Sequence, residues 1–278
     1  MPKVSIVLPV HNGEHFIAQA IKSVENQSFQ DWELCVVDDG STDGTKTVVG
    51  QAQSSDPRIR YVSEESKGIQ KALNKGLAMA RGQYVARIDD DDRWIEPDKL
   101  ARQVAFLDKH GEYALVGTGA VVRDERGVEL SRFLNPETDE AIRRSILGKN
   151  CFTHSSVLFR KDIIRDIGGY DESSGTLHVE DYDLWLRVGK KRKFANLPIY
   201  GISWTLRASG TGFRNKLEQF KNALAVSRRH RHAYPNAWGG ALRHCARIAL
   251  YGIFSLIPGA VLRQNLVRFW ARAFRRAL

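Results

Sequence analysis

The stretch ARIDDDDRW, from Ala86 to Trp94, places four consecutive aspartates directly after an apolar run. The residues before it, GQYVARI (82–88), have the composition of a buried strand. Neighbouring carboxylates repel one another, so an acidic run at a strand end calls for compensation. One interpretation is a solvated loop. The other is a site for Mg²⁺ or Mn²⁺, because both ions prefer oxygen ligands and share them with substrate phosphates.

The chain around this aspartate tetrad (89–92) alternates between strand and helix patterns. Apolar runs predict strands at 4–10, 32–39, 59–64 and 83–89, and helical periodicity predicts helices at 14–27, 44–53 and 69–82. This order predicts an α/β fold with a mostly parallel central sheet flanked by helices on both faces. Ligands bind at the carboxyl ends of the strands in such sheets. We therefore expect PVHNGE (9–14), DDGSTDG (38–44) and DDDDRW (89–94) to line one crevice.

The chain after Pro97 is less regular. Its patterns predict a helix at 98–110, strands at 113–124 and 154–160 with a hairpin turn around Gly127, and helices at 161–169 and 179–191. The three cysteines fit neither a metal site nor a redox motif, so we expect free thiols in a reducing compartment. The N-terminal apolar run is too short and too β-branched for a signal peptide.

The turn DDGSTDG (38–44) allows two interpretations. Its Gly and Ser residues fit a helix entry with Ser41 or Thr42 as the cap. Asp38 and Asp39, at the end of an apolar strand, are better explained as acceptors for a base imide or a ribose hydroxyl. No P-loop motif is present, and GTGAVV (117–122) lacks the third glycine of a dinucleotide fingerprint.

Four segments in order resemble the family-two glycosyltransferases, which are inverting nucleotide-sugar transferases of the GT-A fold. The segments are VSIVLPVHNGE (4–14), QSFQDWELCVVDDGSTDGT (27–45), GIQKALNKGLAMARGQYVARIDDDD (68–92) and EDYDLWLRV (180–188), with GGYDE (168–172) between the last two. The resemblance covers about residues 3–207. It implies a GT-A-like single domain over 1–218, with a nucleotide-sugar-binding half (1–110) and an acceptor half (111–218).

The resemblance also implies where the donor and a metal ion bind. Pro9 and His11 match positions that hold the nucleobase, and Asp39 matches the aspartate on the uridine side. Asp89 and Asp91 match the D-x-D pair, with Asp91 as ligand of Mn²⁺ or Mg²⁺. The full set expected to bind the nucleotide-sugar is Pro9, His11, Asn12, Glu14, Asp38, Asp39, Lys71, Asp89, Asp90 and Arg207, and the metal set is Asp91 and Asp89.

Three assignments within this resemblance stay open. Counting back from Pro97 moves the metal ligand from Asp91 to Asp92. Lys67 and Lys71 either face the diphosphate or are solvated. His154 opens a strand in the acceptor half and is either structural or part of the site.

Asp181 matches the general base of the family, with Glu180 beside it. An inverting transfer needs a carboxylate to take the proton of the acceptor hydroxyl. The alternative is that both acids only favour the start of a helix. The RWxxQ-type segment of processive synthases is absent, which favours addition of a single sugar, with a UDP-linked donor and a lipid-linked glycan acceptor. The other classes considered are a sugar-nucleotide-forming nucleotidyltransferase and a non-catalytic sugar-nucleotide-binding protein at the membrane.

The net charge of +10 resides in the C-terminal part. Residues 219–278 contain eleven Lys and Arg and no Asp or Glu, whereas residues 1–218 contain 31 basic and 32 acidic residues. We interpret 219–278 as a basic amphipathic helical tail. Its uncharged stretch 248–262 is interrupted at Pro258 and predicts an interfacial or re-entrant segment, because a span needs about 20 apolar residues.

Residues 263–278 form a helical pattern with aromatic residues on one side and arginines on the other. This pattern is typical of a helix lying on an anionic membrane surface. The alternatives are packing on the domain or another copy, and nucleic-acid binding, which we do not expect. The chain is therefore expected to be cytoplasmic and peripheral on the inner face of the cell membrane.

Overall fold

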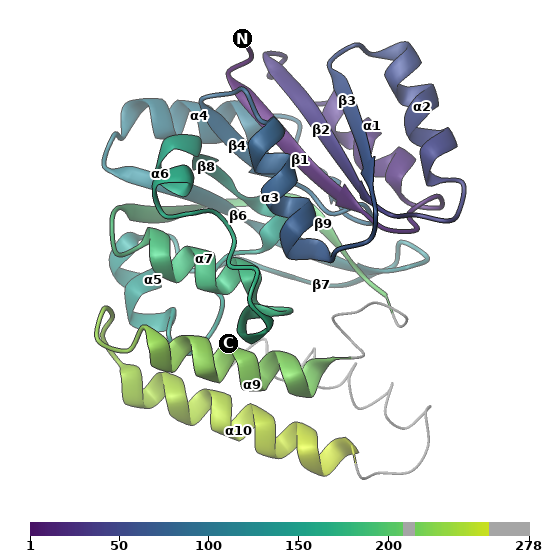
Figure 1. Cartoon of the computed structure of the whole chain (residues 1–278). Coiled ribbons are helices and arrows are strands. Elements are labelled where there is room, and N and C mark those ends of the chain that lie inside the picture. The colour runs from purple at the N-terminus through teal and green to yellow at the C-terminus, as the bar shows by residue number, and fades with distance from the viewer. Residues whose placement is uncertain (208–214, 256–278) are drawn as a thin grey trace.

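The computed structural model describes residues 1–207 and 215–255 (Figure 1). A nine-stranded sheet has the order β3-β2-β1-β4-β8-β6-β9-β5, with β7 paired to β6. The strands are β1 (Val4–Val10), β2 (Trp32–Asp39), β3 (Ile59–Glu64), β4 (Tyr84–Arg87), β5 (Arg93–Trp94), β6 (Tyr113–Asp124), β7 (Glu129–Phe133), β8 (Leu158–Arg160) and β9 (Lys193–Leu206). The helices are α1 (Ile17–Glu25), α2 (Thr45–Ser55), α3 (Ile69–Met79), α4 (Lys99–Lys109), α5 (Asp139–Ser145), α6 (Lys161–Asp166), α7 (Glu180–Val188), α9 (Lys216–Arg229) and α10 (Ala237–Ser255), with short 3-10 helices η1 (His154–Ser156) and η2 (Ser174–Thr176).

The first half is the predicted parallel sheet. β1 pairs in parallel with β2 and β4, and β2 pairs in parallel with β3. Every residue of β1 is buried, which explains its continuous apolar run. Ile6 and Leu8 pack into the core under α1 and α4, while Val7 packs with Leu73 of α3 on the opposite face. The carboxyl ends of β1, β2 and β4 therefore meet at one edge of the sheet.

The second half makes the sheet mixed, which the sequence patterns did not predict. β8 pairs antiparallel with β4 and with β6, and β5 pairs antiparallel with β9. β6 and β9 are parallel. The predicted strand at 154–160 divides into η1 and β8. The predicted turn at Gly127 joins β6 to β7, and Gly127 has a φ of +82°, a conformation that glycine adopts readily.

The tetrad connects the inner strand β4 to the edge strand β5. β4 ends at Arg87, and six residues later the chain begins β5, whose Arg93 pairs with Ser203 of β9. Trp94 donates its indole N–H to the backbone oxygen of Ser155. The aspartates therefore occupy the link where the curled sheet brings β4 and β9 together.

The helices α9 and α10 pack on the acceptor half, with α9 between α7 and α10 (Figure 1). Ser227 of α9 and His244 of α10 both bond to the backbone oxygen of Leu147, at 2.7 and 3.1 Å. His230 lies 3.2 Å from Asp183 of α7. The boundary at 218/219 stays a prediction, and the predicted amphipathic helix 263–278 lies outside the described residues. Within residues 1–207 and 215–255, no helix is long and apolar enough to span a bilayer.

Candidate active site

The loop after β1 is bonded to the loop after β2. Asn12, with a φ of +54°, accepts a hydrogen bond from the backbone N–H of Thr42 and donates its own N–H to Ser41. The Nδ1 atom of His11 lies 2.7 Å from the backbone oxygen of Asp39. Both His11 and Asn12 are exposed, and Pro9 is a buried residue of β1. Three of the predicted donor-binding residues therefore share one end of the sheet.

Glu14 holds the start of α2. Its Oε2 accepts the backbone N–H of Gly44 at 2.6 Å, and Gly13 donates its N–H to Thr45. The bond to Glu14 satisfies a backbone N–H at the start of α2 that has no partner within the helix, and the bond from Gly13 fixes the Thr45 side chain. Glu14 thus has a positioning task in the structure, and its contact with the donor stays a prediction.

Asp38 and Asp39 have different surroundings although they are adjacent. Asp38 is 1% exposed and accepts hydrogen bonds from Tyr61 and from the N–H of Ser41. Asp39 is partly exposed and accepts the backbone N–H groups of Lys67 and Gly68 at 2.6 and 3.0 Å. Asp38 therefore stabilises the turn, while Asp39 joins β2 to the loop before α3.

Two predicted lysines flank that same loop. Lys67 and Lys71 are both exposed, and Lys71 lies in the first turn of α3. Their contact with a diphosphate stays a prediction.

The tetrad forms a turn, with the N–H of Asp92 bonded to the backbone oxygen of Asp89 at 3.2 Å. Asp92 points inward: it is 1% exposed and accepts hydrogen bonds from Ser155 Oγ and from the N–H of Thr205. Burial, followed by the charges of its neighbours, raises the pKa of Asp92 well above its usual value. Both carboxyl oxygens of Asp92 are already occupied by these inward hydrogen bonds, so Asp92 is poorly placed as a metal ligand.

Asp89 is paired with Arg87, the last residue of β4. Arg87 is 2% exposed, forms an ion pair with Asp89 and also lies 3.4 Å from Ser155 Oγ. Burial raises the pKa of Asp89, but the charge and hydrogen bond of Arg87 outweigh it and hold the pKa below the usual value. Asp89 is consequently ionised at neutral pH.

Asp90 and Asp91 are the two acids left on the outer side of the turn. Burial and the neighbouring carboxylates raise the pKa of Asp90 to about 7 and that of Asp91 to about 6. Arg207, just after β9, lies 3.2 Å from Asp91 Oδ2, and its guanidinium stands over the ring of Phe16 at 4.7 Å. The predicted residue Arg207 therefore lies beside the tetrad, although the two are more than 100 residues apart in the sequence.

The donor set of the turn suits a hard cation. Asp89 to Asp91 offer only carboxylate oxygens, which Mg²⁺ and Mn²⁺ prefer. The raised pKa values of Asp90 and Asp91 mark a concentration of negative charge that a cation would relieve. No group of three or more His, Cys, Asp or Glu is arranged as a metal cage in residues 1–207 and 215–255. Asp89 to Asp91 themselves supply oxygen ligands of the kind that Mg²⁺ shares with substrate phosphates.

Glu180 and Asp181 begin α7. Asp181 accepts hydrogen bonds from Asn150 Nδ2 at 2.7 Å and from the N–H of Tyr182 at 2.6 Å. Burial raises the pKa of Asp181 to about 6, and burial together with the charge of Asp181 raises that of Glu180 to about 7. Within the described part of the chain, the buried Oε2 atom of Glu180 has no hydrogen-bond partner. Helix-start acids normally have low pKa values, so burial distinguishes this pair from ordinary helix-start acids.

One buried cation links the acid pair to the tetrad. The charge of Arg87 lowers the pKa of both Glu180 and Asp181, and the charge of Asp89 raises both. Arg87 was not among the predicted site residues, because an arginine in the apolar run QYVARI gives no signal of its own. Ser155, which bonds to Asp89 and Asp92, was also missed, because a serine in HSSVLFR (154–160) gives no signal of its own.

His154 lies beside this network. Its Nε2 atom is 2.8 Å from the Tyr170 hydroxyl, and its ring contacts Trp185 edge-on. Burial and the charge of Arg87 lower the pKa of His154 well below its usual value, so the ring is neutral. These contacts favour the structural interpretation of His154.

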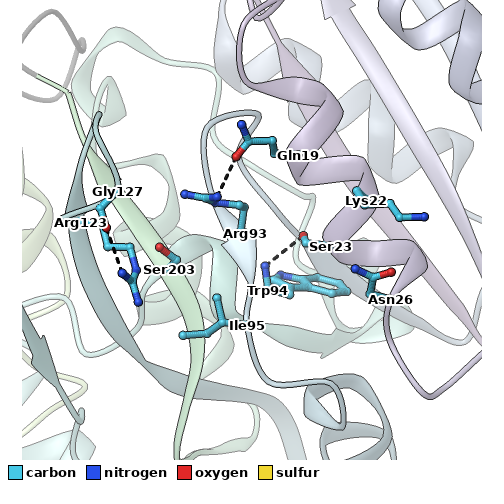
Figure 2. Close-up of a pocket in the computed structure, with 10 residues that line it drawn as sticks. All are labelled: Gln19, Lys22, Ser23, Asn26, Arg93, Trp94, Ile95, Arg123, Gly127 and Ser203. Carbon is cyan, nitrogen blue, oxygen red and sulfur yellow. Dashed lines mark hydrogen bonds between the residues drawn. The ribbon is translucent and has the colours of Figure 1, made fainter. Parts of the chain in front are cut away.

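A hollow of about 530 Å³ lies elsewhere, between α1 and the strands β5, β6 and β9 (Figure 2). Among the residues that line this hollow, Arg93 bonds to Gln19, and Trp94 donates its backbone N–H to Ser23 Oγ. None of its ten lining residues belongs to the predicted site. The site is thus defined by its side chains rather than by this hollow.

Residues 5–168 match the profile "Glycosyl transferase family 2". The chain belongs to this family. Its members transfer a sugar from a nucleotide-sugar, so the predicted family and activity class are confirmed, and the alternative of a nucleotidyltransferase is set aside.

Named relatives agree with family 2. EpsE of Bacillus subtilis, which carries the name of a glycosyltransferase, is 41% identical over 67% of this chain; the match spans 66% of EpsE, just under two thirds of its length. WfgD of Escherichia coli, named as a UDP-Glc:alpha-D-GlcNAc-diphosphoundecaprenol beta-1,3-glucosyltransferase, is 31% identical over 80% of this chain and 84% of its own.

A solved structure supports the fold. The mannosyltransferase PcManGT of Pyrobaculum calidifontis, solved with GDP-Man and Mn²⁺, superposes with a TM-score of 0.65 at 20% identity, covering 99% of this chain and 82% of its own. The predicted α/β fold of the GT-A type is therefore confirmed.

Proposed function

We propose that this family 2 member transfers a single sugar with inversion from a UDP-sugar to a hydroxyl of a lipid-linked glycan. The carrying observation is that Asp91 of the tetrad and the acid pair of α7 all respond to the charges of the buried Arg87 and of Asp89, its ion-pair partner. A donor-binding group and a base must lie this close for a direct displacement. The name of WfgD supports the UDP-linked donor and the diphospholipid acceptor.

The proposed reaction assigns one task to each side of the site. His11, Asn12 and Asp39 bind the nucleoside at the ends of β1 and β2. Asp91, with Asp89, holds Mn²⁺ or Mg²⁺, which supplies positive charge to the leaving diphosphate. Asp90 and Arg207 border the same phosphate position.

Asp181 takes the proton of the acceptor hydroxyl as its oxygen attacks the anomeric carbon opposite the leaving diphosphate. A pKa raised to about 6 keeps Asp181 ionised at neutral pH while making it a stronger base than an exposed aspartate. Asn150 orients the carboxylate through its hydrogen bond to Oδ2. Glu180 is the coupled partner, and the two carboxylates titrate as a pair.

We also place the enzyme in surface polysaccharide assembly, peripheral on the inner face of the cell membrane. The basic composition of residues 219–278 supports this placement, since anionic lipids attract such segments. Nucleic acid is not part of the proposed function.

The proposal is tested by binding and hydrolysis of UDP-, GDP- and dTDP-sugars with and without Mn²⁺. We expect slow Mn²⁺-dependent release of UDP from one donor, lost in Asp91→Ala and retained in the control Asp166→Asn, whose carboxylate is exposed on α6. Binding to none of these donors would contradict the proposal. NMR of the transferred sugar then reports whether the anomeric configuration is inverted.

A further inference from the structure

The outward side of α10 is an exposed apolar stripe. Trp238, Leu242 and Ile253 are 91%, 71% and 60% exposed, and Cys245 is exposed beside them. Their spacing of three to four residues, or a multiple of it, places them on one helical face. We call Trp238, Leu242, Cys245 and Ile253 the α10 stripe.

The opposite side of α10 is fixed to the domain. Gly240 lies against the backbone of Leu147, and Arg247 donates to the backbone oxygen of Gly148 at 2.9 Å. His244 is buried on the same side. α10 is the outermost of the helices stacked on α7 (Figure 1), so the stripe faces away from the sheet.

The stripe is concentrated rather than scattered. Three of the seven large exposed hydrophobic side chains in the described residues belong to it. Isolated apolar side chains on a surface need no explanation, but a contiguous set indicates an interaction surface.

The charges around the stripe select the partner. Residues 219–255 contain six basic residues and no acidic one, and Lys221, Arg228, Arg231 and Arg243 are exposed. A second copy would bring the same positive charge against itself, which is unfavourable. Nucleic acid would satisfy the arginines but would leave the tryptophan and leucine in water. A bilayer with anionic headgroups satisfies both the charge and the apolar side chains.

We propose that the α10 stripe is the membrane-contacting face of this protein and that α10 lies in the plane of an anionic bilayer surface. Its biological sense rests on the proposed lipid-linked acceptor, which would be presented at the same surface. The stripe enters the boundary between headgroups and acyl chains, while the arginines stay at headgroup level. The geometry locates binding on a folded helix of the domain, independently of residues 256–278.

The chain carries its own reporter for a test. Cys245 lies on the stripe and is exposed, whereas Cys35 and Cys151 are buried. An environment-sensitive NBD label on Cys245 of the full-length protein can therefore be titrated with vesicles of phosphatidylcholine alone or with about one third phosphatidylglycerol. We expect a blue shift and quenching by doxyl-labelled lipids only with the anionic vesicles. A label on Val128→Cys in a Cys245→Ser background is the control, since Val128 is exposed on the distant β6–β7 turn.

Variants of the α10 stripe then distinguish a membrane from the other possible partners of this surface. Trp238→Ser with Leu242→Ser should weaken sedimentation with anionic vesicles by about tenfold or more, since burying each large apolar side chain contributes about that much. Val128→Ser should not change it. Unchanged binding of the double variant would overturn the proposal. So would a concentration-dependent blue shift without lipid, which means a second copy, or a label already shielded in the free protein, which means this chain's own residues cover the stripe.

Donor hydrolysis in solution distinguishes the two proposals. The double variant should hydrolyse the sugar donor at the wild-type rate, because the α10 stripe is not part of the site. Loss of all donor binding in a wild type that still binds vesicles would contradict the proposed function alone. An NBD signal from Cys245 that does not change on addition of vesicles, in an enzyme that is active, would contradict only the role of the α10 stripe.

Discussion

Replacing Arg87 with methionine removes the buried cation between the tetrad and the acid pair of α7 while keeping a side chain of similar length. Arg87 is 2% exposed and paired with Asp89, so the change leaves a carboxylate without its partner. Removing one member of a fully buried ion pair costs about 3–5 kcal/mol, and since the Asp89 side chain is 35% exposed we expect about 3 kcal/mol here. A destabilisation of 1 kcal/mol lowers Tm by about 2–4 °C in domains of roughly this size. We therefore expect Tm to fall by roughly 10 °C.

The same substitution should move the pH dependence of activity. The charge of Arg87 lowers the pKa of Glu180 and Asp181, so its loss raises both. A nearby opposite charge shifts a carboxyl pKa by about one to three units, and Arg87 does not contact the pair directly, so we expect about one unit. The base must be ionised to act. The ascending limb of the pH–rate profile should consequently move to higher pH, and activity at pH 6.5 should fall several-fold while recovering above pH 8.

The assay is donor hydrolysis or transfer from pH 5 to 9 at saturating Mn²⁺, beside thermal melting of each variant. Arg87→Lys is the matched control, since it keeps the positive charge and should keep the limb close to that of the wild type. If Arg87→Met lowers Tm but leaves the limb in place, Arg87 only stabilises the fold and the electrostatic argument is refuted. A limb that moves equally in the lysine variant would also refute it.

Three further predictions follow from the same contacts. Asp92→Ala should lower the free energy of unfolding by about 1–3 kcal/mol in urea titrations, because it leaves the buried N–H of Thr205 without its acceptor, while Ser155 Oγ keeps Asp89. Asp91→Ala should change the free energy of unfolding by less than about 1 kcal/mol and abolish Mn²⁺-dependent donor binding. A Cβ on Gly13 would lie 2.5 Å from Val10 Cγ2 and 2.7 Å from Asp90 Oδ2, so Gly13→Ala must displace these side chains and should raise KM for the donor about tenfold; an unchanged KM would show that the position of Asp90 does not affect donor binding. Burial raises the pKa of Glu180 in the folded protein from its usual value of 4.5 to about 7, so its ionisation destabilises the metal-free protein as pH rises from about 4.5 to 7. Glu180→Gln should flatten that decline, and parallel stability curves for variant and wild type would contradict it.

The first half of the fold could be predicted because its strands leave clear runs in the sequence. β1, β2 and β3 begin and end at the predicted residues. β1 and β2 are buried on both faces and therefore leave continuous apolar runs, whereas the edge strand β3 is mostly half-buried and is marked by its β-branched and aromatic residues. β6 also matches its predicted bounds. The helix ends were predicted less well, because they depend on contacts outside the helix. α1 is shorter than predicted at both ends, α2 begins one residue later and ends two residues later, and α3 begins at the predicted residue but ends three residues earlier.

The second half depends on contacts between distant segments. β9 was not predicted, and β5 has only two residues, so its existence depends entirely on pairing with β9 more than 100 residues later. Likewise, Arg207 reaches Asp91 only because β9 ends beside the tetrad. No local pattern encodes such a contact, whereas the acids it serves stand out in the sequence.

The four aspartates look equivalent in the sequence because a run of identical residues has no visible register. The structure separates them because residues 89–92 form a turn rather than an extended strand, and successive side chains of a turn point in different directions. Asp89 and Asp91 each lie against an arginine, whereas Asp92 is buried with hydrogen-bond donors and Asp90 lies beside Gly13. Two of the charges are thereby opposed by cations, and the pKa of Asp90 and of Asp92 is raised, so the run carries fewer than four negative charges at neutral pH. The fold tolerates four adjacent acids by giving each a different partner. A cation bound at the outer side of the turn would favour the ionised form of Asp90. Metal binding should therefore release protons. The number of protons released near pH 6.5 measures how much carboxylate repulsion remains in the metal-free protein.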